Sequence, residues 1–289
     1  MDSPFTVLAV IKDEPLRIIP LLENFEGIAK VIVLLDPKDQ LTEAILIERS
    51  IEYVKRPENF YDISQAERTD WVLRQSPTKY VLISYASFYV PIKLLKLFSQ
   101  VARDGNYDAV VHATNSWSHG KLVQEPWIRK RSSACYFFNR DKVNIVLAMT
   151  HNEFPINQKN NCLTAPPYRD YSIHIFRDDD MSVLTLKEIA YAEGEAAERL
   201  VKDGPVTLQF LIYKTLKSFL VGYLRMGGFR SGIEGLVYHV HHALQQFLVY
   251  SKLWELQNKK CFEDNRVLHV GIRRKFIAQD RYECAKHKS

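Results

Sequence analysis

The sequence predicts an α/β protein in which a parallel sheet carries helices on its faces and is followed by a helical extension. Two observations carry this prediction. Short apolar runs alternate with segments of helical periodicity over the first half of the chain, and from Ser182 onward almost every segment has the helical pattern. The 289 residues suffice for one large domain or two small ones.

The first strand is predicted at Phe5 to Ile11, where a continuous β-branched apolar run ends in Lys12-Asp13-Glu14-Pro15. A run without polar alternation is typical of a strand that is buried on both faces, as in parallel sheets. Pro15 to Phe25 then carries apolar residues at close to the helical period and predicts a helix.

The same alternation continues through three more strands with helices between them. The segments follow in order: strand Lys30 to Leu35, helix Thr42 to Arg49, strand Ile51 to Val54, helix Ser64 to Arg74 and strand Tyr80 to Ile83. Strand, helix, strand order favours right-handed crossovers that build a parallel sheet.

Further strands are predicted at Asp108 to Val111, Ala134 to Asn139 and Tyr171 to Phe176. A polar insertion, Thr114 to Trp127, separates the first two and is long enough to predict a functional loop.

The remaining chain is predicted to be helical, with helices at Ser182 to Val201, Leu208 to Met226 and Ser231 to Leu256 and a hinge at Gly227-Gly228. We therefore expect three parts: a ligand-binding α/β domain over 1–180, a helical extension over 181–257 and a basic tail over 258–289.

Composition restricts the function classes. Hydrophobic residues make up 46% and charged residues 25% of the chain, which excludes a disordered or collagenous protein. The 39 Lys and Arg against 34 Asp and Glu give a net charge of +5, too small an excess to predict nucleic-acid binding. Residues 251–289 carry ten of these cations against five acids, so the tail is basic and could dock on anionic lipid or a phosphorylated acceptor.

Cysteine usage and the opening residues predict a location. Cys135, Cys162, Cys261 and Cys284 are widely spaced, without the paired spacing of a zinc site or a disulfide framework. The opening residues lack the basic and apolar regions of a signal peptide. We expect a cytoplasmic protein, with peripheral contact at the cytoplasmic membrane face left open.

Ligands of open α/β sheets bind outside the carboxyl ends of the strands. In this sequence those positions are Lys12 to Glu14, Asp36, Arg56 and the turn Ser84 to Tyr89.

Two histidine-containing segments invite a chemical interpretation. On an extended segment His151 and Glu153 project from the same face, as in a general base and its partner, although a solvated turn is favoured on spacing alone. His239, His241 and His242 suggest a metal site, but no carboxylate stands at ligand spacing, and buried histidines are favoured.

The helix Leu208 to Met226 places Lys214, Lys217 and Arg225 on one stripe of an otherwise apolar surface. It is too charged to span a bilayer. A helix lying in the headgroups of an anionic membrane and an ordinary packed helix with its lysines in water fit this pattern equally.

The order of segments resembles the inverting family-2 glycosyltransferases of GT-A fold, in the branch with the lipopolysaccharide-core glucosyltransferases. Val7 to Glu14 resembles the family's opening strand ending in Asn-Glu, Val31 to Asp36 its second strand, and Tyr80 to Pro91 the strand that leads to Asp-Ala-Asp. The more specific match is Gly227-Gly-Phe-Arg230-Ser-Gly-Ile-Glu-Gly235 with Tyr250-Ser-Lys-Leu-Trp254-Glu. The likeness covers about residues 5 to 257 and implies a Rossmann-like, mixed, mostly parallel sheet.

The resemblance implies a transfer of sugar, with inversion, from a nucleotide-diphosphate sugar to a glycan or glycolipid in lipopolysaccharide or polysaccharide biosynthesis. Glu153 would be the catalytic base and His151 would orient it. The implied nucleotide-sugar contacts are Val10, Lys12, Glu14, Asp36, Arg68, Tyr85 and Ser87.

One departure limits this expectation. The Asp-Ala-Asp that binds a divalent ion in the family aligns with Tyr85-Ala86-Ser87, which offers no carboxylate. We therefore expect no required metal, although Mg²⁺ or Mn²⁺ stays open, and cationic side chains would neutralise the diphosphate. The candidate cations are Arg56, Arg68, Lys121, Arg129 and Lys130. The rival hypothesis is an inactive pseudo-glycosyltransferase that binds or scaffolds.

Overall fold

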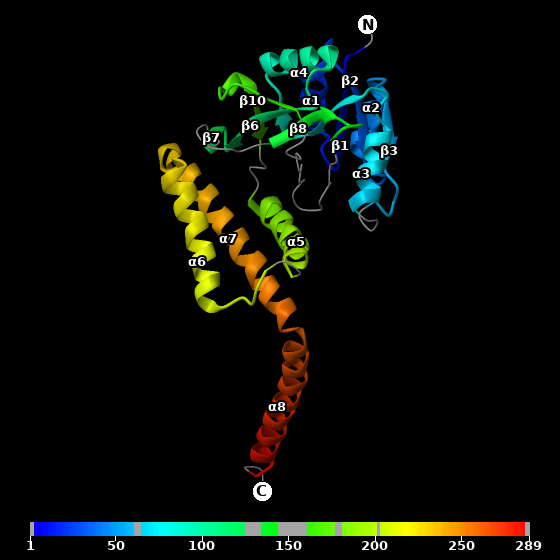
Figure 1. Ribbon diagram of the computed structural model, residues 1–289. Coiled ribbons are helices and arrows are strands. Elements are labelled where there is room, and N and C mark those ends of the chain that lie inside the picture. The colour runs from blue at the N-terminus through cyan, green and yellow to red at the C-terminus, as the bar shows by residue number, and fades with distance from the viewer. Residues whose placement is uncertain are drawn as a thin grey trace. The chain divides into compact units, whose positions relative to one another are not determined.

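The computed structural model describes residues 3–60, 65–124, 134–143, 161–176, 181–200 and 203–286 (Figure 1). The strands are β1 Thr6–Ile11, β2 Lys30–Leu35, β3 Tyr53–Lys55, β4 Tyr80–Tyr85, β5 Phe88–Tyr89, β6 Ala109–Ser118, β7 Lys121–Gln124, β8 Ala134–Asn139, β9 Cys162–Thr164 and β10 Ser172–Phe176. The helices are α1 Ile18–Phe25, α2 Gln40–Glu48, α3 Gln65–Arg74, α4 Ile92–Asp104, α5 Met181–Arg199, α6 Leu208–Leu220, α7 Gly232–Gln257 and α8 Lys259–Lys286.

The strands form one mixed, mostly parallel sheet in the order β3-β2-β1-β4-β8-β6-β10-β5, with β7 and β9 also paired to β6. The strands β3, β2, β1 and β4 run parallel. Because β8 is antiparallel to both β4 and β6, β6 again runs in the direction of β4, and β10 runs parallel to β6. The predicted α/β class with a mostly parallel sheet is confirmed, and the carboxyl ends of β1, β2, β4, β6 and β10 share one edge.

Helices cover both faces of the sheet, as the apolar runs predict. Successive strand residues point to opposite faces. Val7, Ala9 and Ile11 belong to a core with residues of α1 and α4, whereas Leu8 packs in a second core that includes Val72 of α3. Burial on both faces explains why the β1 sequence shows no polar alternation.

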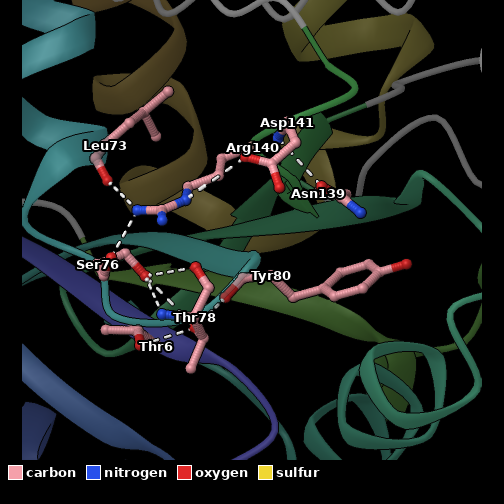
Figure 2. Close-up of polar contacts among 8 residues, drawn as sticks. All are labelled: Thr6, Leu73, Ser76, Thr78, Tyr80, Asn139, Arg140 and Asp141. Carbon is pink, nitrogen blue, oxygen red and sulfur yellow. Dashed lines mark hydrogen bonds and ion pairs between the residues drawn. The ribbon is translucent and has the colours of Figure 1, made fainter.

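The opposite edge of the sheet is fastened by a polar network (Figure 2). The Arg140 guanidinium donates to the carbonyl oxygens of Leu73 and Ser76, at the end of α3, over 2.8 and 2.5 Å. The hydroxyls of Thr6 and Thr78 join the starts of β1 and β4 at 2.8 Å. The Arg140 contacts supply a side-chain donor to carbonyls at and just beyond the carboxyl end of α3.

The polar insertion Thr114 to Trp127 is not the predicted loop over its described part. Strand β6 continues to Ser118 and turns back into β7 through His119 and Gly120, whose φ angles are 50° and 70°. Two consecutive positive φ angles match the twist of a tight hairpin. The usual sequence signal for such a turn is Asn-Gly. The pair His119-Gly120 does not match this signal, so the hairpin was not predicted.

The chain divides into two compact units, one formed by 1–185 with 219–241 and the other by 186–218 with 242–289. In the second unit Ala196, Val206, Tyr250 and Leu253 form a small core. The predicted domain boundaries at residues 180 and 257 stay predictions.

The predicted break at Gly227-Gly228 is present, because Gly227 has a φ of 78° between a π-helical turn, Val221–Arg225, and a 3-10 turn, Gly228–Ser231. The basic tail is helical as α8. No helix in the described ranges has the length and apolarity needed to cross a bilayer.

Candidate functional site

The candidate site lies at the carboxyl edge of the sheet, beside β1. The chain proceeds from β1 to β2 and β3 on one side and places β4 on the other, so the strand order reverses at the β1 and β4 ends. In open α/β sheets this reversal is where ligands bind. The register places Val10 directly beside Tyr85, and the Asp36 amide donates to the Ile11 carbonyl over 3.0 Å. The backbone of Val10, Asp36 and Tyr85 therefore converges there.

A buried ion pair braces this edge. The Arg56 guanidinium lies 3.1 Å from the Asp36 carboxylate, with side-chain exposures of 1% and 11%, and also donates to the Ile11 carbonyl over 3.1 Å. Its carbon Cζ lies 5.1 Å from the centre of the Phe60 ring. Arg56 is thus committed to holding the ends of β1 and β2 together.

The turn after β1 is fixed by an acidic residue from the turn after β2. Asp13 has a positive φ of 53°, a conformation in which Asp is better tolerated than most residues. Its amide donates to one Asp39 carboxylate oxygen over 2.7 Å, and the Thr42 amide donates to the other over 3.0 Å, capping α2.

These contacts decide whether the edge fits a divalent cation. The Asp36 carboxylate accepts from Arg56 and from the Lys38 amide, and both Asp39 oxygens accept amides. A hard cation needs several oxygen ligands, and no group of three or more metal-ligating side chains exists within the part of the chain that the structure describes. The described residues at this edge therefore do not fit a divalent ion. Binding of Mg²⁺ or Mn²⁺, which the sequence left open, has no ligand set among them.

Arg68 is a buried cation in the helix that follows β3. It lies in the first turns of α3, one turn before Val72, whose core Val10 also packs against. Arg68 is only 5% exposed, and no described residue accepts a hydrogen bond from its buried Nε. A buried guanidinium donor is costly to leave without an acceptor, so Arg68 is a candidate contact for an anion.

The segment Tyr85-Ala86-Ser87 connects this edge to the β5 and β10 strands. The Tyr85 ring contacts the Phe88 ring edge-on, with centres 5.1 Å apart. The Ser87 carbonyl accepts the Phe176 amide over 2.8 Å. No side chain in the three residues carries a charge, so any negative ligand here must be neutralised from elsewhere.

An aromatic cluster, which the sequence analysis did not predict, follows along the same edge. The Trp117 and Phe176 rings stack with centres 5.7 Å apart and an interplanar angle of 19°, in register across β6 and β10. His174 lies 5.8 Å from the Tyr89 ring. Phe176 and Tyr89 are exposed. The two-residue spacing of Asn115 and Trp117, and of His174 and Phe176, was the signal that could have revealed this face.

His174 holds the Trp117 indole in place. The indole Nε1 donates to His174 Nδ1 over 2.8 Å, so the neutral ring carries its proton on Nε2 and donates to the Arg169 carbonyl over 3.2 Å. Burial lowers the pKa of His174 below its usual value, outweighing the carbonyl contact. The ring stays neutral at neutral pH and orients Trp117.

The other predicted site residues are distributed as follows. Glu14 lies just after β1 and contacts Arg17 at 3.4 Å, and Lys12 lies in the same turn. Lys121 pairs with Glu234 over 2.8 Å. His151, Glu153, Arg129 and Lys130 lie outside the described residues.

The glycine-rich motif 227–235 builds a close packing around His239. A Cβ on Gly222 or Gly228 would overlap the His239 imidazole, and one on Gly235 would overlap the Gly228 carbonyl. The imidazole lies 3.3 Å from the Val123 carbonyl of β7. Burial lowers the pKa of His239, and the favoured interpretation of His239 and His241 as buried histidines is confirmed.

A groove of about 670 Å³ lies within the second unit, between α5, α6 and α7. Its lining is mostly apolar, including Ile189, Leu211, Phe247 and Trp254. None of the predicted site residues lines it.

Comparisons with known proteins return structures of low similarity. No protein-family model and no curated protein matches the chain. Residues 1–349 of TarS from S. aureus match with a TM-score of 0.39 and 11% identity over 88% of this chain and 91% of that one. Glucosyl-3-phosphoglycerate synthase from Mycobacterium tuberculosis, in complex with Mn²⁺, UDP and phosphoglyceric acid, matches with a TM-score of 0.34 and 15% identity over 48% and 57%.

This chain spans about half the length of the synthase and of the longer TarS structure, at 44% and 49%. The mixed, mostly parallel sheet is established by the strand order of the chain itself.

Proposed function

We propose that the chain is a glycosyltransferase of GT-A type that moves a sugar from a nucleotide-diphosphate donor to a glycan or glycolipid. The observation that carries the proposal is the convergence of Val10, Asp36 and Tyr85 at the strand-order reversal between β1 and β4. This is the position at which nucleotides bind in open α/β sheets. The resemblance to the inverting family-2 enzymes supplies the sugar chemistry.

The donor would lie along the carboxyl edge. Glu14 and Asp36 face the nucleoside, with Val10 and Lys12 beside it, while Tyr85 and Ser87 line the diphosphate. Arg68 supplies the positive charge, since its Nε is buried and donates to no acceptor in the described part of the chain. Bidentate guanidinium contacts stabilise a leaving diphosphate without a metal.

The proposed transfer is a single displacement. The acceptor hydroxyl oxygen forms a bond to the anomeric carbon while the bond from that carbon to the diphosphate oxygen breaks, and the diphosphate leaves with the electron pair. The hydroxyl proton passes to Glu153, which His151 orients, in the roles that the resemblance implies. Attack opposite the leaving group inverts the anomeric centre.

The aromatic cluster suits the sugar side of the reaction. The stacked rings of Trp117 and Phe176 lie at the edge where the Phe176 amide donates a hydrogen bond to the Ser87 carbonyl. Carbohydrate rings have apolar C–H faces that aromatic side chains cover. The cluster therefore fits a sugar held next to the diphosphate.

The decisive test is calorimetric titration with UDP, with and without Mn²⁺, on the full chain. We expect binding that does not need Mn²⁺ and that weakens at least about tenfold in Arg68→Ala, because a charged hydrogen bond is lost. Arg74→Ala, an exposed cation on the same helix, serves as the control and should bind like the parent chain. Absence of UDP binding would refute the donor site.

Turnover separates the enzyme from the rival pseudo-glycosyltransferase. The rival has one observation in its favour, the absence of any carboxylate in Tyr85-Ala86-Ser87. UDP-sugar hydrolysis or transfer that disappears in Glu153→Gln supports the enzyme and its base. UDP binding without turnover supports the rival, and normal transfer by Glu153→Gln would show that Glu153 is not the base.

A further inference from the structure

The outward face of α6 is apolar. Leu208, Ile212 and Leu216 follow one another every four residues and are 70%, 50% and 54% exposed, with Tyr213 at 55% beside them. Residues four apart lie on the same side of a helix. They form one exposed apolar stripe, which we call the α6 face.

The inner side of the same helix carries Lys214, although a surface helix normally turns its lysines toward water. Phe210 and Leu211 pack against the Tyr250 core, and the Lys214 ammonium lies 5.0 Å from the Phe210 ring centre and 5.4 Å from that of Tyr250. Ordinary amphipathic helices place the lysine in water and the leucines inside. The α6 face is therefore an exposed apolar surface of the kind that marks an interaction site.

The segment that carries the α6 face has charges of one sign. No Asp or Glu occurs in residues 204–220, whereas Lys214 and Lys217 both lie in α6. Lys217 is exposed on α6, and its ammonium lies 5.3 Å from the Tyr213 ring centre. A surface of leucine and lysine without carboxylates complements an apolar layer that is bordered by anions.

We propose that the α6 face inserts into the boundary between headgroups and acyl chains of an anionic phospholipid leaflet. Leu208, Ile212 and Leu216 enter the acyl region, and Lys217 contacts the phosphates. A second copy of the chain is the less suitable occupant, because pairing two such faces brings together the Lys217 side chains of two α6 helices that carry no carboxylate. The proposal is independent of the sugar chemistry, since no proposed site residue lies on α6.

Vesicle sedimentation of the full chain tests the proposal. We expect binding to phosphatidylcholine vesicles containing about a third phosphatidylglycerol, weaker binding to pure phosphatidylcholine, and a decrease with added salt. Ile212→Asp and Leu216→Asp should each weaken binding roughly tenfold or more. Lys217→Glu should weaken binding most at low salt.

The control is Leu41→Asp, which alters an equally exposed leucine (72%) on α2 and should leave vesicle binding unchanged. Ile212→Ser with Leu216→Ser tests the apolar contribution without adding charge, and circular dichroism establishes that each variant is folded. Unchanged binding by the Asp variants, equal loss in Leu41→Asp, or no binding by the parent chain would overturn the proposal. It would also fail if ultracentrifugation found a dimer that the Asp variants dissociate and vesicles did not bind.

Discussion

At the scale of single residues, Arg56 joins the ends of two strands at the candidate edge. It pairs with Asp36 in a nearly buried environment and also holds the Ile11 carbonyl. Its position at a strand end predicts a cation for the diphosphate. In the structure the Arg56 guanidinium instead pairs with Asp36 at the end of β2. No local sequence pattern predicts this contact, because the two residues are brought together only by the pairing of the strands.

We predict that Arg56→Ala lowers the free energy of unfolding by about 3–5 kcal/mol, because it leaves a buried carboxylate without its cation. Urea denaturation measures the change. Arg74→Ala, which breaks a 2.7 Å pair on the exposed surface, should cost less than about 1 kcal/mol. The double change Arg56→Met with Asp36→Leu should cost less than Arg56→Ala alone. If Arg56→Ala and Arg74→Ala lowered the free energy of unfolding equally, the buried Arg56–Asp36 pair would not have the proposed stabilising role.

At the scale of elements, the glycine-rich motif fastens α7 to the β6–β7 hairpin. Ser231 donates to the Leu122 carbonyl over 2.8 Å, Glu234 pairs with Lys121, and His239 fills the space left by Gly222 and Gly228. The motif was the most specific part of the sequence resemblance. Its described contacts show a structural reason for its glycines.

Gly235→Ala should destabilise the protein by about 2 kcal/mol or more, because the added methyl group overlaps the Gly228 carbonyl. Gly271→Ala is the matched change on α8, where nothing lies within 4 Å of the added Cβ. It should raise helix stability by about 1 kcal/mol. Thermal denaturation and circular dichroism separate the two, and a harmless Gly235→Ala would disprove the close packing.

The elements that sequence predicted best are those whose burial is complete. The strands β1, β2 and β4 appear as unbroken apolar runs because both of their faces are covered, and the structure places them within two residues of the predicted bounds. The β6–β7 hairpin was missed because its turn residues, His119 and Gly120, are an unusual pair. The aromatic cluster was missed because Trp117 and Phe176 meet only through the pairing of β6 with β10.

At the scale of the whole molecule, buried neutral histidines make stability depend on pH. Burial lowers the pKa of His112 to about 4, and it also lowers the pKa values of His174 and His239. The unfolded chain takes up these protons near pH 6.5, before the folded chain does. Stability from these groups is thus complete above pH 6.5 and is lost as the pH falls below it, and for His112 the loss continues to about pH 4.

For His112 alone we expect a loss of about 3 kcal/mol between pH 7 and pH 4. His112→Phe keeps ring contacts to Phe98 and Tyr136 and should show a smaller dependence than the parent chain when unfolding is measured at both pH values. Identical pH dependence in the two proteins would show that His112 does not contribute.

The first compact unit is completed by residues 219–241, which follow the residues that open the second unit. Synthesis on the ribosome proceeds at roughly 5–20 residues per second, so several seconds separate the making of β7 from the arrival of Ser231 and His239. Neither unit is made from one continuous stretch of sequence. A fragment that stops at residue 185 would contain every described strand of the sheet but lack the segment that contacts β7. No single truncation of the chain therefore yields either unit complete.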